Sequence, residues 1–284
     1  MDGFIIVDKP DGITSHDVVS KLRKKLKIKR IGHTGTLDPI ATGVLPICIG
    51  ICTKASDFLV ADEKIYEATI KLGVLTDTSD ITGNIIEEKK VDIKELPIEN
   101  VIYSFIGKQK QKPPIYSAVK VNGKKLYEYA REGKKVEIPE REIEIFDIKL
   151  KHIDVQNNLI DITVHCSKGT YIRSLCVDIG TKLGTIATMQ SLRRIQSGIF
   201  NIDKAIKLDE INEATKLITL EDVFKMKKKI ILKDFEILKL LNGVKLKKDL
   251  KDEIYRIYDF KNNFIGLGSV KDNYLKREII IEWV

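Results

Sequence analysis

Short hydrophobic segments bounded by turn residues run through most of the chain and predict a mixed α+β fold. We expect strands at residues 4–7, 44–51, 64–73, 143–151, 159–166 and 186–200. Val18, Leu22 and Leu26 recur every four residues, which predicts a helix that Ser15 would cap. Further helices are expected at 53–60 and 93–106, and a third that opens at the glycine turn before Tyr171 and runs to about residue 183.

The pattern changes after residue 200. Residues 201–229 are expected to be helical and linker-like, and they end in a lysine-rich stretch. A short helix at 235–241 and three strands at 253–260, 264–270 and 277–284 follow. The pattern therefore predicts two domains. Residues 1–229 would form a mixed, mainly antiparallel sheet with flanking helices, and 230–284 a small β-rich domain.

One stretch, residues 32–46, is too rich in glycine and proline for a helix. Glycine permits crowded or left-handed backbone, and Pro39 disfavours the helical region for the residue before it. Asp38 is therefore expected in an extended, rigid loop that leads into the buried strand at 44–51.

The composition changes this picture in two respects. Among 284 residues, 49 are basic and 41 acidic, and the net charge of +8 favours a polyanionic partner. The four cysteines form no C-x-x-C pair, which indicates buried thiols in a reducing compartment.

The N-terminus lacks the pattern of a signal peptide, and no apolar run is long enough to span a bilayer. We therefore expect a cytoplasmic protein.

Two basic tracts are candidate RNA-binding surfaces. Residues 108–135 interleave lysines with Tyr116, Tyr127 and Tyr129, and such aromatic rings stack on unpaired bases. The alternative is a hairpin whose tyrosines only pack against the protein. Lysines and arginines also cover one face of the helix expected after Ser15, as either a solvated face or a phosphate-contacting one.

The remaining motifs narrow the possible chemistry. The chain has no P-loop, no G-x-S-x-G motif and no metal-ligand spacing among its four histidines. Asp38 remains, and a lone aspartate can act as a nucleophile or general base without a metal or cofactor. Arg173 is a candidate partner that would keep a buried carboxylate ionised, although the sequence alone leaves this pairing a hypothesis.

Several separated motifs resemble one known family. They are Lys9-Pro10-x-Gly12-x-Thr14-Ser15, residues 32–39 and 41–46, Lys64-x-Tyr66, residues 169–173, and Leu192-Arg193-Arg194-x-x-x-Gly198. Together they resemble the TruB family of tRNA pseudouridine-55 synthases along essentially the whole chain. The resemblance implies that uridine 55 in the T loop of tRNA is flipped out and isomerised to pseudouridine, with neither metal nor cofactor.

The resemblance also assigns roles to positions of this chain. Asp38 matches the essential aspartate, Tyr66 the tyrosine that stacks on the flipped base, and Arg173 the arginine that pairs with the aspartate. The positions that match substrate-binding residues are His33, Lys9, Pro10, Tyr171, Leu192, Lys54, Asp80 and Arg131. Residues 108–135 correspond to an insertion that folds over the T loop, and 230–284 to a PUA-like domain that contacts the acceptor arm.

The expected partner is tRNA. We expect the protein to be a monomer that neither binds a membrane nor needs another protein. One alternative is a non-catalytic tRNA-binding protein or tRNA-folding chaperone. Asp38 argues against it, because a carboxylate in a site for a polyanion weakens RNA affinity. A second alternative is a guide-RNA-dependent synthase of the archaeal and eukaryotic type. The insertion and the brief C-terminal domain favour the stand-alone bacterial type.

Overall fold

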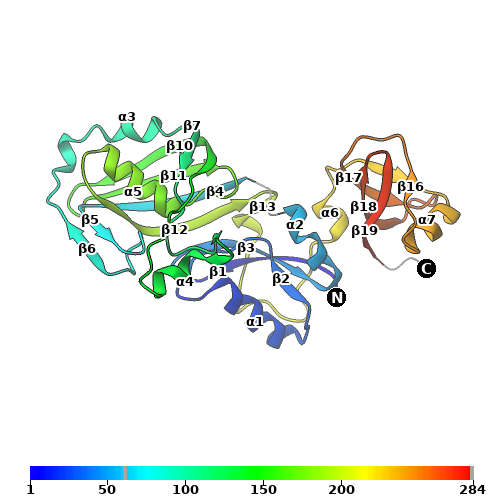
Figure 1. Cartoon of the computed structure of the whole chain (residues 1–284). Coiled ribbons are helices and arrows are strands. Elements are labelled where there is room, and N and C mark those ends of the chain that lie inside the picture. The colour runs from blue at the N-terminus through cyan, green and yellow to red at the C-terminus, as the bar shows by residue number, and fades with distance from the viewer. Residues whose placement is uncertain (60–62, 282–284) are drawn as a thin grey trace.

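The computed structural model describes residues 1–59 and 63–281 and shows a large sheet-based part followed by a small C-terminal β-rich part (Figure 1). This arrangement confirms the predicted α+β fold class. In the described residues, no helix is long and apolar enough to cross a membrane.

The large sheet contains ten strands of the described chain, in the order β14-β1-β3-β12-β4-β11-β10-β7, with β2 paired to β3 and β13 to β12. Its strands are β1 Gly3–Lys9, β2 Ile31–His33, β3 Thr42–Ile49, β4 Lys64–Leu72, β7 Gly107–Gln111, β10 Arg141–Asp154, β11 Leu159–Cys166, β12 Ala187–Ser197, β13 Phe200–Asn201 and β14 Ile206–Lys207. All pairs are antiparallel except β1–β14 and β3–β12. The mainly antiparallel sheet agrees with the prediction.

The β3–β12 pair joins the two halves of this sheet through only two residue pairs, one of which is Gly43 with Arg194. Gly43 has φ +96°, and a Cβ there would lie 2.2 Å from the carbonyl oxygen of Arg194. Only glycine fits such a close approach of two backbones. The short parallel contact therefore depends on the glycine in the loop that carries Asp38.

Strand β4 shows how the sheet divides its two faces. Tyr66, Ala68 and Ile70 are buried, while Glu67 points to the opposite face, as period-two alternation requires. The buried face belongs to the main hydrophobic core, shared with α1 (Ser15–Leu26) and α5 (Ile172–Lys182). Tyr66 therefore lies on the core face of the sheet, the same face as the two helices.

The start of α1 differs from the prediction. The N-cap is Thr14, which forms a reciprocal capping box with Asp17, rather than Ser15. Ser15 lies one residue inside the helix, 1% exposed, and its hydroxyl is used elsewhere. Two adjacent hydroxyl residues made the cap ambiguous, and the acidic residue three positions after Thr14 decides it.

Replacing Thr14 by alanine should lower the free energy of unfolding by about 1 kcal/mol. The variant loses the bond from the Asp17 amide to the Thr14 hydroxyl, 3.0 Å long. Urea titration of purified wild type and variant measures the difference, and identical midpoints would contradict the assigned cap.

Three other predicted helices need correction. Pro97 divides 93–106 into a 3₁₀ turn η2 (Ile93–Glu95) and a short helix α3 (Ile98–Tyr103), because proline cannot continue a helix from within. The helix expected at 53–60 is a 3₁₀ segment η1 (Gly50–Ala55) followed by α2 (Ser56–Leu59), and residue 60 lies outside the described residues. Residues 201–229 are mostly not helical.

In that last region, only η3 (Ile202–Lys204) and α6 (Leu220–Val223) are helical. Strand β14 pairs with β1 at the edge of the sheet, and Ile218 bridges Phe4. The segment is therefore held along the edge of the large sheet and is not a free linker between two domains.

The C-terminal sheet has five strands in the described chain, ordered β15-β17-β18-β19-β16. They are β15 Lys229–Ile231, β16 Leu246–Lys247, β17 Ile254–Tyr258, β18 Phe264–Lys271 and β19 Tyr274–Ile280, with helix α7 at Asp234–Leu241. The helix and three longer strands match the prediction, whereas β15 and β16 were missed because they are very short. Residues 282–284 of the last predicted strand lie outside the described residues.

Leu267 and Ile279 of this sheet pack in one cluster with Phe4 and Phe200 of the large part. The boundary between residues 229 and 230 stays a prediction, because this apolar cluster crosses it.

Two hairpins lie beside the large sheet. One joins β5 (Val74–Thr76) to β6 (Ile85–Glu88). The other joins β8 (Lys120–Val121) to β9 (Lys124–Lys125) and leads into α4 (Leu126–Arg131), within the predicted insertion. Asn122 and Gly123 both have positive φ, as the predicted two-residue hairpin turn requires.

Candidate active site

A cavity of about 550 Å³ lies where the Asp38 loop, β4, the insertion, the start of α5 and β12 meet. It is lined by Thr34, Gly35, Thr36, Leu37, Asp38, Lys64, Tyr66, Ser117, Ala118, Arg141, Glu142, Lys168, Gly169, Thr170, Tyr171, Ile172, Arg173, Leu192 and Arg194. Segments far apart in the sequence thus supply one concave site, which is the usual form of a ligand-binding pocket.

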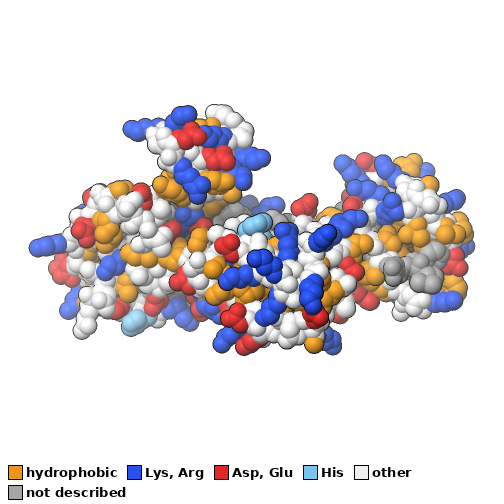
Figure 2. All heavy atoms as spheres, turned by 90° about the horizontal axis from the view of Figure 1, so that it is seen from below, with side chains coloured by type: hydrophobic (Ala, Val, Ile, Leu, Met, Phe, Trp, Pro, Cys, Tyr) orange, Lys and Arg blue, Asp and Glu red, His pale blue; other side chains and the backbone are white. Residues whose placement is uncertain are grey.

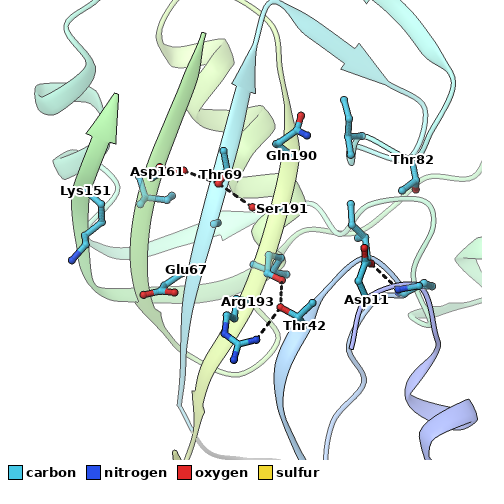
Figure 3. Close-up of a pocket in the computed structure, with 17 residues that line it drawn as sticks. Asp11, Thr42, Glu67, Thr69, Thr82, Lys151, Asp161, Gln190, Ser191 and Arg193 are labelled. Carbon is cyan, nitrogen blue, oxygen red and sulfur yellow. Dashed lines mark hydrogen bonds between the residues drawn. The ribbon is translucent and has the colours of Figure 1, made fainter. Parts of the chain in front are cut away.

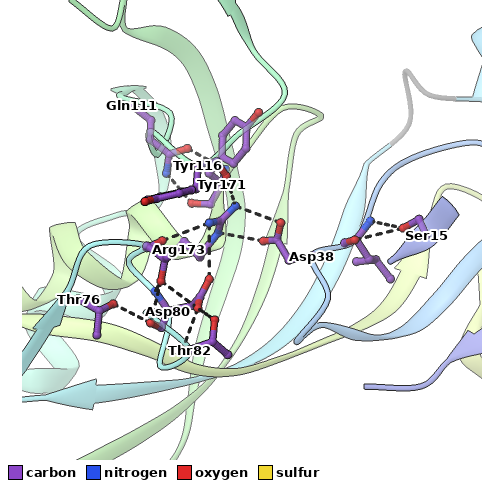
Figure 4. A network of polar contacts seen from close by, with 11 residues as sticks. Ser15, Asp38, Thr76, Asp80, Thr82, Gln111, Tyr116, Tyr171 and Arg173 are labelled. Carbon is purple, nitrogen blue, oxygen red and sulfur yellow. Dashed lines mark hydrogen bonds and ion pairs between the residues drawn. The ribbon is translucent and has the colours of Figure 1, made fainter. Parts of the chain in front are cut away.

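Arg173 and Asp38 form an ion pair at the centre of this cavity (Figure 4). Nε of Arg173 lies 2.9 Å from Oδ2 of Asp38, and Nη2 donates a 3.0 Å hydrogen bond to Oδ1. The arginine side chain is 5% exposed, whereas a third of the Asp38 side chain remains open. The Arg173 guanidinium is therefore buried in the protein, whereas the Asp38 carboxylate is accessible from the cavity.

A second carboxylate, Asp80, faces the same arginine at 3.6 Å. Asp80 is itself fixed by the hydroxyls of Thr78 and Thr82 and by the amide of Thr82. The arginine also donates to the carbonyl of Thr78, at 3.2 Å. One guanidinium therefore serves two carboxylates, and only Asp38 of the two opens into the cavity.

Burial governs the ionisation of Asp38. Burial raises the pKa of the Asp38 carboxyl above its ordinary value, while the Arg173 guanidinium counteracts this rise and Asp80 adds to it. The net direction is upward. Arg173 therefore lowers a pKa that burial and Asp80 would otherwise raise further.

Tyr66 projects into the cavity from β4, opposite Arg194 of β12. Burial raises the pKa of the Tyr66 hydroxyl, and the adjacent Arg194 guanidinium moderates this rise. Arg194 is almost fully buried and donates to the carbonyls of Val44 (2.7 Å) and Gly35 (3.3 Å). It therefore connects the tyrosine, strand β3 and the beginning of the Asp38 loop.

The Asp38 loop is held from behind by two side chains. The Ser15 hydroxyl accepts from the amide of Leu37 at 2.8 Å and donates to the same residue's carbonyl at 3.2 Å. Lys9 is fully buried and donates to the carbonyl of Pro39 at 3.0 Å. Both backbone neighbours of Asp38 are thus anchored, which agrees with the predicted rigid loop.

Two family models match the chain consecutively. Residues 23–172 match the TruB family pseudouridylate synthase N-terminal domain. Residues 173–232 match the tRNA pseudouridylate synthase B C-terminal domain. The chain belongs to the TruB family of pseudouridylate synthases.

Similar proteins agree with membership in the TruB family. The tRNA pseudouridine synthase B of Clostridium novyi (strain NT) is 46% identical over 99% of this chain and 100% of its own length. That of Clostridium kluyveri is 43% identical over 97% and 98%. A protein in the structure of an H/ACA ribonucleoprotein bound to a substrate RNA containing 2′-deoxyuridine has the same fold, with a TM-score of 0.71 and 24% identity over 99% of this chain and 85% of its own.

The structure brings most of the residues assigned through the TruB resemblance together. Asp38, Tyr66, Tyr171, Arg173 and Leu192 line the cavity. Asp80 adjoins it through Arg173, and Lys9 supports the loop from behind.

Four other assigned residues lie outside the cavity lining. His33 is half-buried on β2, where its Nδ1 accepts a long bond from the Gly35 amide. Pro10, Lys54 and Arg131 are exposed, and Arg131 stacks over the ring of Tyr127. Any role of these four residues is in contacts with RNA outside the cavity, and that remains a prediction.

Sequence reasoning missed Ser15 as a loop anchor and Arg194 as the partner of Tyr66. Ser15 was read as a cap because it precedes a helix. Arg194 and Leu192 are two residues apart on β12 and both are buried, and this period-two spacing was the signal that both face the core.

A larger groove of about 920 Å³ is lined by Pro39 and Ile40 of the Asp38 loop together with residues of β4, β11 and β12 (Figure 3). Its polar lining includes three carboxylates, Asp11, Glu67 and Asp161, against two cations, Lys151 and Arg193. The Asp38 cavity has the reverse balance, with the cations Lys64, Arg141, Lys168, Arg173 and Arg194 and the carboxylates Asp38 and Glu142. A polyanion is therefore better matched to the smaller cavity.

The insertion projects from the body as a lobe with basic side chains (Figure 2). Lys124 lies over the ring of Tyr129, and Lys125 lies over the ring of Tyr127. The two tyrosines thus pack against the lobe's own cations, as the packing alternative predicted, while the lobe still presents a basic surface.

The basic face of α1 makes contacts within the protein. Arg23 donates to the Ile31 carbonyl, Arg30 to the Thr53 hydroxyl, and Lys27 pairs with Glu213. These contacts favour the first alternative for this face, in which its basic side chains are solvated and do not bind phosphates. No group of three histidine, cysteine, aspartate or glutamate residues in the described ranges is arranged to hold a metal ion.

Proposed function

We propose that this chain converts uridine 55 in the T loop of tRNA to pseudouridine, with Asp38 as the essential carboxylate. The observation that carries the proposal is the Asp38–Arg173 ion pair, which opens on its carboxylate side into a cavity rich in cations. Membership in the TruB family and the names of the similar proteins support the same reaction.

The reaction breaks the bond between N1 of uracil and C1′ of ribose and forms a bond between C5 and C1′. C5 loses a proton and N1 gains one, so no oxidant, reductant or cofactor is consumed. Asp38 supplies the carboxylate that attacks the nucleotide or assists the departure of uracil, and Arg173 keeps it ionised. The ring of Tyr66 stacks on the detached base. Its hydroxyl oxygen is the candidate acceptor for the C5 proton, provided that it gives up its own proton to solvent in the same step.

The nucleotide has to leave the RNA stack before Asp38 reaches it. Base flipping costs a few kcal/mol, and stacking on aromatic rings together with phosphate contacts offsets this cost. Tyr66 and Tyr171 supply rings inside the cavity, and Lys64, Arg141 and Lys168 supply cations in its lining.

The geometry also weighs against a role limited to RNA binding or folding. A non-catalytic binder gains nothing from an open carboxylate beside a flipped nucleotide. The identity of 43–46% to Clostridium proteins named tRNA pseudouridine synthase B, over nearly the whole chain, favours the bacterial type over a guide-RNA-dependent enzyme. We further infer a cytoplasmic monomer without an obligate protein partner, divided into a catalytic domain (1–229) and a PUA-like domain (230–284).

The proposal is tested by mapping pseudouridine in a T-arm stem-loop transcript incubated with purified protein. The assay is run without and with EDTA, because the proposed chemistry needs no metal. We expect conversion of the single uridine at the position that corresponds to 55. Conversion of no uridine, or loss of conversion on adding EDTA, would contradict the proposal.

We propose that the C-terminal domain contacts the acceptor arm through its exposed lysines, such as Lys245 and Lys247. Charge reversal is a cleaner test than deletion, because deletion would expose the apolar cluster around Leu267. The double variant Lys245→Glu, Lys247→Glu should weaken binding of full-length tRNA by ~10-fold or more at low salt. Binding of an isolated T-arm hairpin serves as the control and should change little. Equal losses on both RNAs would contradict the acceptor-arm role.

A further inference from the structure

The first turn of α5, which carries Arg173, is tied to the base of the insertion by side chains rather than by its own cap. Tyr171 is the N-cap residue of α5, and its side chain makes no capping hydrogen bond. The side-chain amide of Gln111, the last residue of β7, instead binds the backbone of this N-cap residue from outside the helix (Figure 4). The orientation of this turn therefore depends on a residue 60 positions earlier in the chain.

Gln111 pairs with the backbone of Tyr171 in both directions. The Tyr171 amide donates to Oε1 of Gln111 at 2.8 Å, and Nε2 of Gln111 donates to the Tyr171 carbonyl at 3.0 Å. Gln111 is 4% exposed, so water has little access to replace either bond. A buried amide that bonds both the N–H and the C=O of one residue fixes the backbone on both sides of that residue's Cα.

Two further bonds join the same segments. The Ser174 hydroxyl donates to the Lys112 carbonyl at 2.7 Å, and Nη2 of Arg173 donates to the Tyr116 carbonyl at 2.9 Å. The same Nη2 donates to Asp38. The guanidinium that holds the reactive carboxylate is thus in direct contact with the backbone of the insertion.

We propose that Gln111 is a positioning residue for catalysis, which locks the Tyr171–Arg173 turn onto the base of the insertion and thereby sets the Asp38–Arg173 pair. This inference rests on the proposed function. Gln111 itself does not line the cavity, so its effect reaches the reaction through Arg173 and Tyr171.

The test compares Gln111→Met with Gln109→Met. Methionine keeps the volume of glutamine and removes both hydrogen bonds. Gln109 lies on the same strand and face two residues earlier, and its amide donates to the Phe105 carbonyl at 2.8 Å instead. We expect kcat to fall by ~10- to 100-fold in Gln111→Met, the scale of a misplaced catalytic group, with KM for a T-arm hairpin changed little. Gln109→Met should retain the wild-type kcat.

A second variant tests the two hydrogen bonds between Gln111 and the Tyr171 backbone directly. In Gln111→Glu, an ionised carboxylate accepts from the Tyr171 amide but has no hydrogen to donate to the carbonyl, whereas the protonated acid does both. The activity relative to wild type should therefore recover as the pH falls from about 8 to about 5.5, because burial raises the pKa of a glutamic acid toward this range. A structural defect unrelated to this bond would not follow the pH in this way.

Amide hydrogen exchange supplies a readout that does not depend on activity. Exchange of the peptide covering residues 171–176 should accelerate in Gln111→Met and stay unchanged in Gln109→Met. Wild-type kcat in Gln111→Met, equal losses in both methionine variants, or unchanged exchange would overturn the inference. If the wild-type protein forms no pseudouridine, the proposed function fails, and the exchange experiment still decides whether Gln111 fixes the turn.

Discussion

Asp38→Asn should abolish pseudouridine formation while the variant still binds tRNA. The amide is nearly isosteric with the carboxylate but has no charge and no nucleophilic oxygen, so we expect a loss of ~10⁴-fold or more in kcat. Affinity for a T-arm hairpin should stay within about threefold, because phosphate contacts supply most of RNA affinity. Single-turnover assays and filter binding measure the two quantities.

The variant should also remain folded. Because the folded-state pKa of Asp38 is raised, the protonated carboxyl stabilises the fold at low pH, and that stability is lost as the pH rises through the raised pKa. At neutral pH the ionised carboxylate is therefore less favourable to folding than a neutral group. The melting temperature of Asp38→Asn should equal or exceed that of the wild type at pH 7.

Glu67→Gln provides the matched control for this prediction. Glu67 is the neighbour of Tyr66 on β4 but points to the opposite face, into the groove of about 920 Å³. Its neutralisation removes one carboxylate close to the site without touching the Asp38 cavity, so activity should be unchanged. Retained turnover in Asp38→Asn would refute the essential role of the carboxylate, and a comparable loss in Glu67→Gln would place the chemistry in the other groove.

The parts of the site that the sequence predicted are those determined by local backbone chemistry. Pro39 and the surrounding glycines indicated an extended loop for Asp38, and the glycine turn before Tyr171 indicated the start of α5. The alternation in β4 placed Tyr66 on a half-buried strand. These features depend on neighbours within a few residues, so a single sequence contains the required information.

The contacts that complete the site depend on pairs far apart in the chain, and local patterns do not encode them. Gln111 meets Tyr171, and Ser15 meets Leu37, only after the sheet has formed. The segment 201–229 was predicted as helical from its composition, but pairing with β1 determines its structure instead. Tertiary contacts override weak local propensity in such segments.

Arg173→Met should nearly abolish activity and move the acid limb of the pH–rate profile to higher pH. The variant leaves Asp38 and Asp80 in the same region without the cation that faces both. The pKa of Asp38 is already raised by burial, and the arginine is the largest influence that lowers it. Its removal raises the pKa further, so a higher pH is needed to ionise the carboxylate.

Arg173→Met should also lower the free energy of unfolding at neutral pH. Breaking a buried ion pair on one side leaves an uncompensated charge, and with Asp38 partly open to solvent we expect a cost of about 2–3 kcal/mol at neutral pH. This cost should shrink as the pH falls and Asp38 becomes protonated, because the neutral carboxyl no longer requires a counter-charge. Unfolding titrations at several pH values measure this trend, and a cost that grows on acidification would contradict it.

Arg173→Lys separates the charge of the arginine from its geometry. Lysine keeps a positive charge near Asp38 but lacks the planar group that contacts Asp38 and the Thr78 and Tyr116 carbonyls at once. Its acid limb should therefore lie between those of the wild type and Arg173→Met, while kcat remains low at every pH. If Arg173→Lys instead regained the wild-type kcat at pH values above its acid limb, a positive charge alone would be enough for catalysis. The fixed placement of Asp38 by the guanidinium would then have no catalytic role.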